Sequence, residues 1–157
     1  MRRTDSPGTK MPKNSIIHPS ENSPAPLYRS DRTFRTWRYG VGHSQLLLRA
    51  VPGSPEEDGL DLLFEGVDAM QLVSRYEALE IHPVSEEEFL SVYTKTGLDP
   101  KWQKEYIVVL LRSRTGEGYV QCQRITVERV GKGATQAEDS SAPRDLIWSL
   151  LTSCSED

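Results

Sequence analysis

The sequence predicts an α+β fold rich in β-structure: a single antiparallel sheet of about six or seven strands, curled or closed into a half-barrel, with one main helix near residues 86–95. Three observations support this prediction. Residues 33–130 contain short apolar or alternating runs separated by turn-forming residues. Only one segment carries a strong helix-start signal. The connections between the runs are short, which favours antiparallel neighbours.

The two ends of the chain differ in composition from its middle. A chain of 157 residues has the length of one domain, but residues 1–32 are rich in Ser and Pro and poor in apolar side chains. Such a segment cannot bury enough surface to offset its ordering entropy, so we expect a disordered tail. We predict a β-rich core domain over residues 33–130. A polar linker and a short C-terminal segment follow in residues 131–157.

The core is expected to begin with a β-hairpin. Residues 34–41 alternate, with Trp37 and Tyr39 on one side, which is typical of a half-buried strand. Gly42 permits a tight turn, and residues 44–49 return as the second strand. The next residues are dense in Pro, Gly and Ser and indicate a loop.

Several further segments have the composition of strands. The predicted strands are residues 60–67, 70–73, 78–81, 106–113 and 119–130. The run at residues 106–113 is the most apolar and is rich in β-branched side chains, which favours a central position in the sheet. Residues 146–151 are interpreted either as a short helix docked on the sheet or as a frayed tail.

One helix is well marked. Ser85 followed three residues later by Glu88 matches a capping box, in which each side chain satisfies a backbone N–H at the start of a helix. The glutamates of the first turn also favour a helix N-terminus. Gly97 can end the helix, because glycine adopts the left-handed conformation of that position without strain.

Gly42-His43-Ser44 invites comparison with a catalytic turn. The nucleophile elbow Gly-x-Ser-x-Gly requires a second glycine between a strand and a helix, but Leu46 stands at that position and a strand follows. The segment therefore predicts a hairpin corner. An enzyme using His43 and His82 would need an orienting carboxylate or a metal, and no spacing ties one to either histidine. We predict no enzyme activity, no catalytic or metal-binding residues and no cofactor.

The remaining features favour a cytoplasmic protein without a membrane-spanning segment. Cys122 and Cys154 lie far apart and form neither a metal-binding pattern nor a disulfide framework. No stretch approaches the roughly 18 apolar residues of a membrane span. No apolar run follows the initial Met-Arg-Arg, so no secretory signal is expected.

The formal net charge of −4 conceals a strong asymmetry along the chain. Residues 50–99 contain twelve Asp and Glu against two Lys and Arg, whereas residues 1–49 contain nine Lys and Arg against three Asp and Glu. Acidic strands could pair with basic ones in a solvated sheet, or an acidic face could dock onto a basic partner. The negative core argues against the large phosphate footprint of a nucleic-acid-binding protein.

The run WRYGVGHSQLLLRA, with the later segments DLLFEGVDAMQL and LEI, resembles small, mostly uncharacterised bacterial β-rich proteins of the antiparallel-sheet type. Some of these proteins are encoded beside polymorphic toxins and resemble immunity proteins. The similarity covers residues 34–82. It implies a protein that binds another protein and performs no catalysis. It transfers no site residues, because immunity surfaces differ from partner to partner.

We therefore expect a non-catalytic, immunity-like interaction module that uses an acidic surface against a basic protein partner. The candidate contact residues are Glu56, Glu57, Asp58, Glu86, Glu87 and Glu88. The alternative is a small-molecule-binding, barrel-like protein with a pocket lined by Trp37, Tyr39 and Phe64. An enclosed apolar pocket would favour the alternative, whereas a filled core with an exposed acidic face would favour the module.

Overall fold

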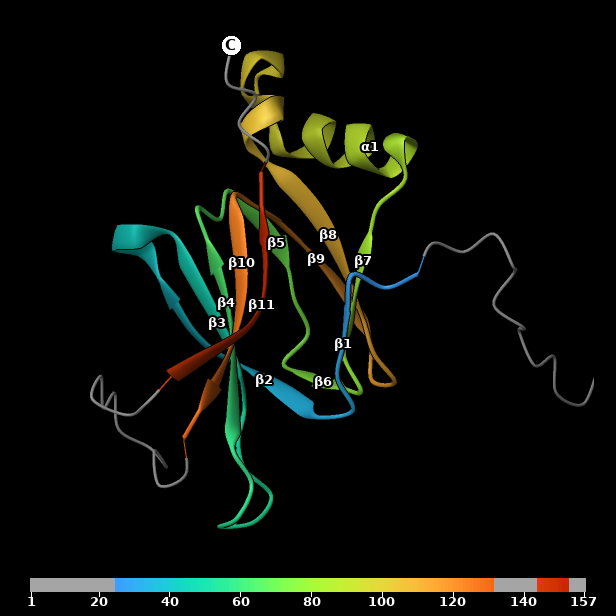
Figure 1. Ribbon diagram of the computed structural model, residues 1–157. Coiled ribbons are helices and arrows are strands. Elements are labelled where there is room, and N and C mark those ends of the chain that lie inside the picture. The colour runs from blue at the N-terminus through green and yellow to red at the C-terminus, as the bar shows by residue number, and fades with distance from the viewer. Residues whose placement is uncertain (1–24, 132–143, 153–157) are drawn as a thin grey trace, which may run out of the picture.

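The strands form two antiparallel sheets that share one core (Figure 1). The computed structural model describes residues 25–131 and 144–152. One sheet has five strands in the order β1-β7-β8-β9-β5, and the other has six in the order β11-β10-β4-β3-β2-β6. The protein is therefore α+β and rich in β-structure, as predicted. The prediction of a single curled sheet of six or seven strands is wrong.

The bounds of the elements are as follows. The five-stranded sheet contains β1 (Tyr28–Arg29), β5 (Ala69–Gln71), β7 (Glu80–Pro83), β8 (Ile107–Arg112) and β9 (Glu117–Cys122). The six-stranded sheet contains β2 (Thr33–Gly40), β3 (Gln45–Ala50), β4 (Gly59–Glu65), β6 (Arg75–Glu77), β10 (Arg124–Val130) and β11 (Arg144–Leu151). The helical elements are the α-helix α1 (Glu86–Thr96) and the 3-10 helices η1 (Val41–His43) and η2 (Pro100–Glu105).

The segment predicted as one strand over residues 119–130 is divided between the two sheets at Gln123. β9 pairs with β8 in the five-stranded sheet, and β10 pairs with β4 in the six-stranded sheet. The backbone N–H of Gln123 donates to the carbonyl of Glu65, and its own carbonyl accepts from the N–H of Thr152. Short connections predict antiparallel neighbours, but they do not reveal that a continuous strand-like run changes sheet. Among the described strands, the chain passes between the sheets here and at four other connections, so the strand-like segments are shared between two sheets.

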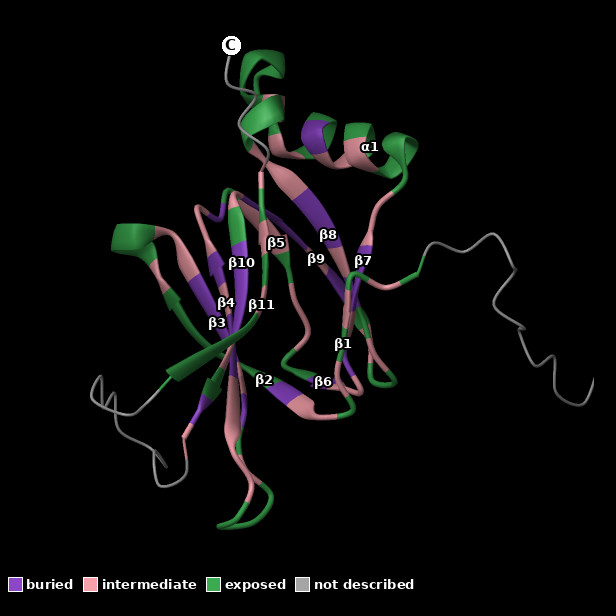
Figure 2. Ribbon diagram, viewed as in Figure 1, coloured by how far each residue is buried: buried purple, intermediate pink, exposed green. Residues whose placement is uncertain are grey.

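Apolar side chains from both sheets fill the space between them. Leu62 and Phe64 of β4 are fully buried, and so are Ile81 of β7 and Val120 of β9. Figure 2 shows the buried positions concentrated on the strands rather than on the loops. Among the described residues, no buried side-chain nitrogen or oxygen lacks a hydrogen-bond partner. The core between the sheets is thus apolar, and its buried polar side chains are hydrogen-bonded.

The helix prediction is confirmed at both ends. The Ser85 hydroxyl accepts a hydrogen bond from the N–H of Glu88, and Gly97 caps the C-terminus with a φ of 68°. α1 lies at one end of the molecule, next to η2 (Figure 1). The hydroxyl of the buried Tyr93 donates to the carbonyls of Gln103 and Tyr106, which connects α1 to η2 and to the start of β8.

The hairpin corner is also confirmed, since η1 joins β2 to β3 and Ser44 adopts the left-handed conformation. The half-buried character expected for β2 is not observed. A β-bulge at Trp37 shifts the register of β2 against β3, and both Trp37 and Tyr39 are exposed. Bulges re-aim side chains in this way, and the alternation of a sequence does not reveal them.

The structure corrects the prediction for both ends of the chain. Residues 25–32 of the predicted tail include β1, which pairs with β7, while residues 1–24 lie outside the described residues. The last apolar run is neither a helix nor a frayed tail, because β11 pairs with β10 along its length. The Tyr28 and Trp148 rings lie 5.5 Å apart between centroids, so these two terminal strands stabilise each other. Most of the predicted linker, residues 132–143, is not described.

Gly118 of β9 occupies a position with no room for a side chain. A Cβ atom there would collide with the backbone of Gln71 and would lie 2.6 Å from the hydroxyl of the buried Tyr76. We expect Gly118→Ala to lower the free energy of unfolding by about 1–3 kcal/mol through overpacking. Gly42→Ala is the matched control, because nothing lies within 4 Å of its Cβ position. Urea denaturation measures both, and equal midpoints for the two variants would contradict this packing.

Candidate functional site

The six predicted acidic contact residues lie in two separate groups. Residues 56–58 are on the loop between β3 and β4, and residues 86–88 form the first turn of α1. These two elements lie at opposite ends of the molecule in Figure 1. The structure therefore brings the members of each group together but does not join the groups into one acidic face.

Several of these acids have partners inside the protein. Glu57 accepts a hydrogen bond from the N–H of Gly53 at 2.6 Å and pairs with Arg32 at 3.3 Å. Asp58 pairs with Arg129 at 3.5 Å. The glutamates of α1 lie at the positive end of the helix dipole, which they complement. Part of the acidic excess of the sequence thus has a structural role.

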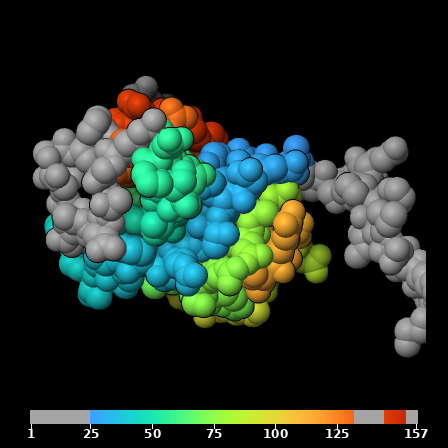
Figure 3. All heavy atoms as spheres, turned by 90° about the horizontal axis from the view of Figure 1, so that it is seen from below, coloured from blue at the N-terminus to red at the C-terminus, as the bar shows by residue number. Residues whose placement is uncertain are grey.

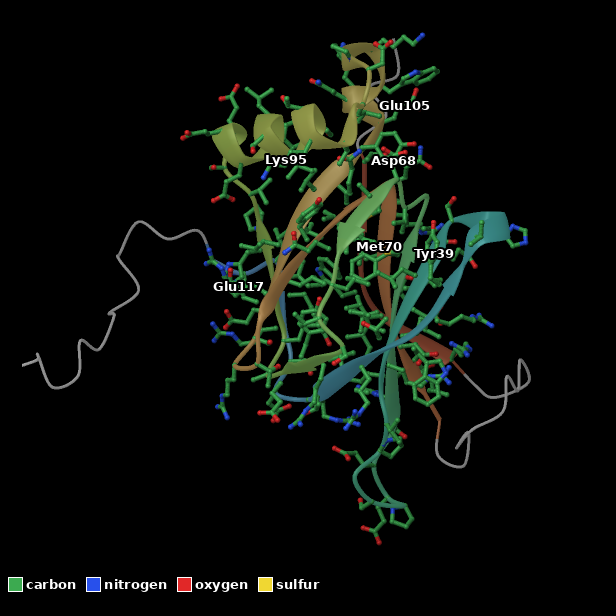
Figure 4. The ribbon with its side chains drawn as sticks, turned by 180° about the vertical axis from the view of Figure 1, so that it is seen from behind. Tyr39, Asp68, Met70, Lys95, Glu105 and Glu117 are labelled. Atoms are coloured by element: carbon green, nitrogen blue, oxygen red, sulfur yellow. The ribbon has the colours of Figure 1, made fainter. Side chains whose placement is uncertain are left out.

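The three residues of the predicted aromatic pocket do not line a common cavity. Phe64 is fully buried in the core between the sheets, whereas Trp37 and Tyr39 are exposed. Figure 4 shows Tyr39 near the β2–β3 hairpin, toward the margin of the molecule. Trp37 and Tyr39 are exposed because β2 carries a bulge at Trp37 and because the end of β2 extends beyond the core.

The two histidines also lie apart. His43 is in η1 of the β2–β3 hairpin, whereas His82 is buried in β7 of the other sheet, with its Nε2 2.8 Å from a Glu80 oxygen. This hydrogen bond, together with Arg29 and against the effect of burial, lowers the pKa of Glu80. Among the described residues, no group of three His, Cys, Asp or Glu side chains could hold a metal ion.

A hollow that the sequence did not predict lies on the side of the six-stranded sheet that faces away from the core. It has a volume of about 420 Å³, and we call it the outer-face hollow. Five strands contribute to its lining, namely β2, β3, β4, β10 and β11. The lining residues are Trp37, Arg38, Gln45, Leu47, Arg49, Asp61, Leu63, Glu128 and Arg144.

Asp61 lies at the centre of a charged network in this hollow. Its side chain is almost completely buried, and the residue is 3% exposed. Arg49 donates two hydrogen bonds to the carboxylate, at 2.7 and 3.0 Å, and Arg144 donates a third at 3.0 Å. Arg144 also donates to Glu128 at 3.1 Å. Burial lowers the pKa of Arg144, but its bonds to Glu128 and Asp61 outweigh this effect and raise that pKa.

The indole ring of Trp37 packs against the guanidinium of Arg49, which also bonds to Asp61. The Arg49 Cζ lies 5.0 Å from the centroid of the indole, which is the geometry of a cation–π contact. The β-bulge in β2 places the indole on this face, and the residue remains 45% exposed. Arg49 is therefore held between a buried carboxylate and a half-exposed aromatic ring.

Only the pairing of the strands brings these residues together. Arg49 lies opposite Asp61 across β3 and β4, and Asp61 lies opposite Glu128 across β4 and β10. In the sequence they are dispersed among strands whose order was not predictable. The one available signal was the charged residue within each of the apolar runs of β3 and β4, at Arg49 and Asp61.

The described lining combines charged, aromatic, polar and aliphatic side chains. It contains three arginines, two carboxylates, one indole, one amide and two leucines, and it contains no Ser, Cys, His or Lys. Guanidinium groups recognise carboxylates and carbonyl oxygens, and an indole packs against apolar or cationic groups. Within the described part of the chain, no helix is long and apolar enough to cross a membrane.

Comparisons with protein-family models, with curated proteins and with solved structures find no match to this chain. The resemblance to immunity-like bacterial proteins is therefore still a prediction.

The two acidic partners of Arg144 should differ in their contribution to stability. Asp61→Asn removes the charge that compensates two partly buried guanidiniums, so we expect the free energy of unfolding to fall by about 1.5–3 kcal/mol. Glu128→Gln is the control. Its side chain is 32% exposed, and exposed ion pairs contribute about 0–1 kcal/mol. Equal losses in chemical denaturation would show that Asp61 is not the centre of the network.

The buried Cys122 should be unreactive in the folded protein. Burial raises the pKa of its thiol to about 12, against a smaller lowering by a hydrogen bond with the Arg124 backbone. The thiol is therefore neutral at neutral pH, and the thiolate is the reactive form. In a Cys154→Ser variant, which leaves Cys122 as the remaining cysteine, a thiol reagent should modify the protein only after denaturant is added. Rapid labelling without denaturant would contradict this placement.

Proposed function

We propose that this chain is a non-catalytic protein-interaction module that binds its partner at the outer-face hollow. The observation that carries the proposal is the half-exposed indole of Trp37, stacked on an arginine that a buried carboxylate fixes in place. Trp and Arg are enriched among the residues that dominate binding energy at protein interfaces. A cytoplasmic location and an immunity-like role, which the sequence led us to expect, belong to the same proposal.

A rigid site loses little entropy on binding. Trp37 and Arg49 are on adjacent strands of one sheet, and Arg49 forms two hydrogen bonds to Asp61. Side chains that are already ordered in the free protein need not be ordered by the partner, which saves about 0.5–1.5 kcal/mol for each of them. Because these side chains are already fixed in the free protein, Trp37 has the character of a binding residue rather than that of an incidental surface tryptophan.

The charges of the hollow indicate the chemistry of the partner. Three arginines face two carboxylates, so the lining is net positive. A partner side chain that packs on Trp37 and is flanked by acidic groups or free carbonyls fits this lining. The acidic residues 86–88 are a second contact region to be tested for a basic partner, because they are exposed and lie together on α1.

Ligands selected from a displayed peptide library against the immobilised full chain test the proposal. Trp37→Ala should weaken the selected ligands about thirty-fold or more, the loss expected for a central interface residue. Trp102→Ala is a closely matched control. Trp102 is 44% exposed and has a Lys101 amine 5.3 Å from its ring, but it belongs to η2 and does not line the hollow.

The variants distinguish the two surfaces. Unchanged binding by Trp37→Ala, or equal losses in Trp37→Ala and Trp102→Ala, would overturn the assignment of the hollow. Loss of binding in a Glu86→Lys, Glu87→Lys, Glu88→Lys triple variant, with normal binding by Trp37→Ala, would transfer the site to the acidic turn of α1. Thermal melting of each variant verifies that the fold is intact.

A further inference from the structure

The edges of the two sheets differ greatly in length. Within the described residues, the sheets end at four strands, of which β1 has two residues and β5 and β6 have three each. Short edge strands offer few open backbone groups to another chain, and this is a common protection against pairing. The fourth edge is β11, which has eight residues and pairs with β10 on one side only.

The composition of β11 does not protect this strand against pairing with another chain. Arg144 and Asp145 begin the strand, but its last six residues, Leu-Ile-Trp-Ser-Leu-Leu, carry no charge. Leu146 is 63% exposed and Leu151 is 58% exposed. An exposed, long and apolar edge strand is the feature that natural sheets normally avoid. A functional pairing would account for it.

Among the described residues, a second stretch without a neighbouring strand on one side, at the end of β2, carries features that hinder pairing, including a charge, which the last six residues of β11 lack. β6 pairs with Thr33–Arg35 and leaves the last residues of β2 without a strand on that side among the described residues. This stretch contains Arg38 and the β-bulge at Trp37, and charges and bulges both hinder edge pairing. β11 is therefore the edge on which a further strand fits best.

We propose that β11 pairs antiparallel with β11 of a second copy of this chain, across a twofold axis. Antiparallel pairing about a twofold axis is self-complementary, because each open N–H of one strand meets an open C=O of the other, and the axis repeats every such bond. The uncharged stretch of β11 introduces no repulsion between two identical strands. Figure 3 shows β11, in red, at the margin of the molecule beside β10.

The bulge in β11 selects one register for this pairing. Leu146, Ser149 and Leu151 lie opposite outward-facing positions of β10, whereas Trp148 and Leu150 pack on the core. Ile147 is the extra residue of the bulge and lines a separate hollow together with Leu60, a residue that packs against the core. Only when Ile147 of one copy lies opposite Trp148 of the other do outward residues face outward residues along the whole strand. Leu146 then faces Ser149 of the second copy.

The contact is small, which determines how it should behave. Eight residues of antiparallel strand extend over about 27 Å. A single strand pair of this length buries less than the about 1,200–2,000 Å² of a standard stable interface. The dimer should therefore be reversible and should depend on protein concentration. This association does not require the proposed role of the outer-face hollow.

Sedimentation velocity of the full chain over a range of concentrations tests the proposal. The wild type should change from the 17.7 kDa monomer toward twice that mass as the concentration rises. Leu146→Lys with Leu151→Lys should remain monomeric, because lysines on an edge strand oppose pairing. Val41→Lys is the control, since Val41 is 79% exposed in η1 and the substitution adds a charge far from β11 in the fold.

Ser149→Lys provides a second test of the same edge. Ser149 is exposed and polar, so this change preserves the leucines of the strand but places a charge opposite Leu146 in the proposed register. It should also give a monomer, with the circular dichroism spectrum of the wild type. A wild type that is monomeric throughout, or a dimer that persists in both β11 variants, would overturn the proposal. Loss of the dimer in Val41→Lys would do the same, because the effect would then not be specific to β11.

Discussion

Gln123 joins the two sheets at the point where the chain crosses from one to the other. Its backbone bonds to Glu65 at the end of β4 and to Thr152 beyond the end of β11, while the residues before it continue into the five-stranded sheet. Another of the crossings lies close by, at Gly66, which leads from β4 toward β5 with a φ of 62°. A Cβ on Gly66 would meet the Gln123 side chain, so the two crossings pack directly against each other. The relative position of the sheets depends on this junction.

The register of the six-stranded sheet follows from the same junction. Arg124 lies opposite Glu65, and from there Glu128 lies opposite Asp61 and Asp61 lies opposite Arg49. A slip of one residue between β4 and β10 would turn Leu62 toward solvent and Asp61 toward the core, since alternate residues of a strand face opposite sides. The outer-face hollow therefore exists only in the native register. Its buried carboxylate with two guanidiniums also penalises every other register, because a slipped pairing would leave a charge uncompensated.

The parts of the fold that depend on local signals were predictable. Ser85 and Gly97 delimit α1 through hydrogen bonds within a few residues, and the hairpin corner at Gly42 depends on adjacent backbone conformations. The division at Gln123 was not predictable, because residues 119–130 contain no turn former and polar residues alternate with apolar ones on both sides of Gln123. The hollow was not predictable either. Arg49, Asp61 and Arg144 meet through three strand pairings, namely β3–β4, β4–β10 and β10–β11. The expected acidic face is instead divided between a loop and a helix.

The edge strand and the hollow are connected through Arg144. This residue begins β11, and its guanidinium bonds to Asp61 in the hollow, so β11 completes one wall of the site as well as forming the edge of the sheet. In a dimer paired through β11, a twofold axis perpendicular to the sheet keeps the outward faces of both copies on the same side. Two hollows then lie on one continuous surface, separated by the paired strands. A partner with two matching segments could occupy both, and the second contact would form at a high effective concentration. Weak pairing of β11 and moderate affinity at each hollow would then reinforce one another, because a partner that bridges both copies also stabilises the pairing between them.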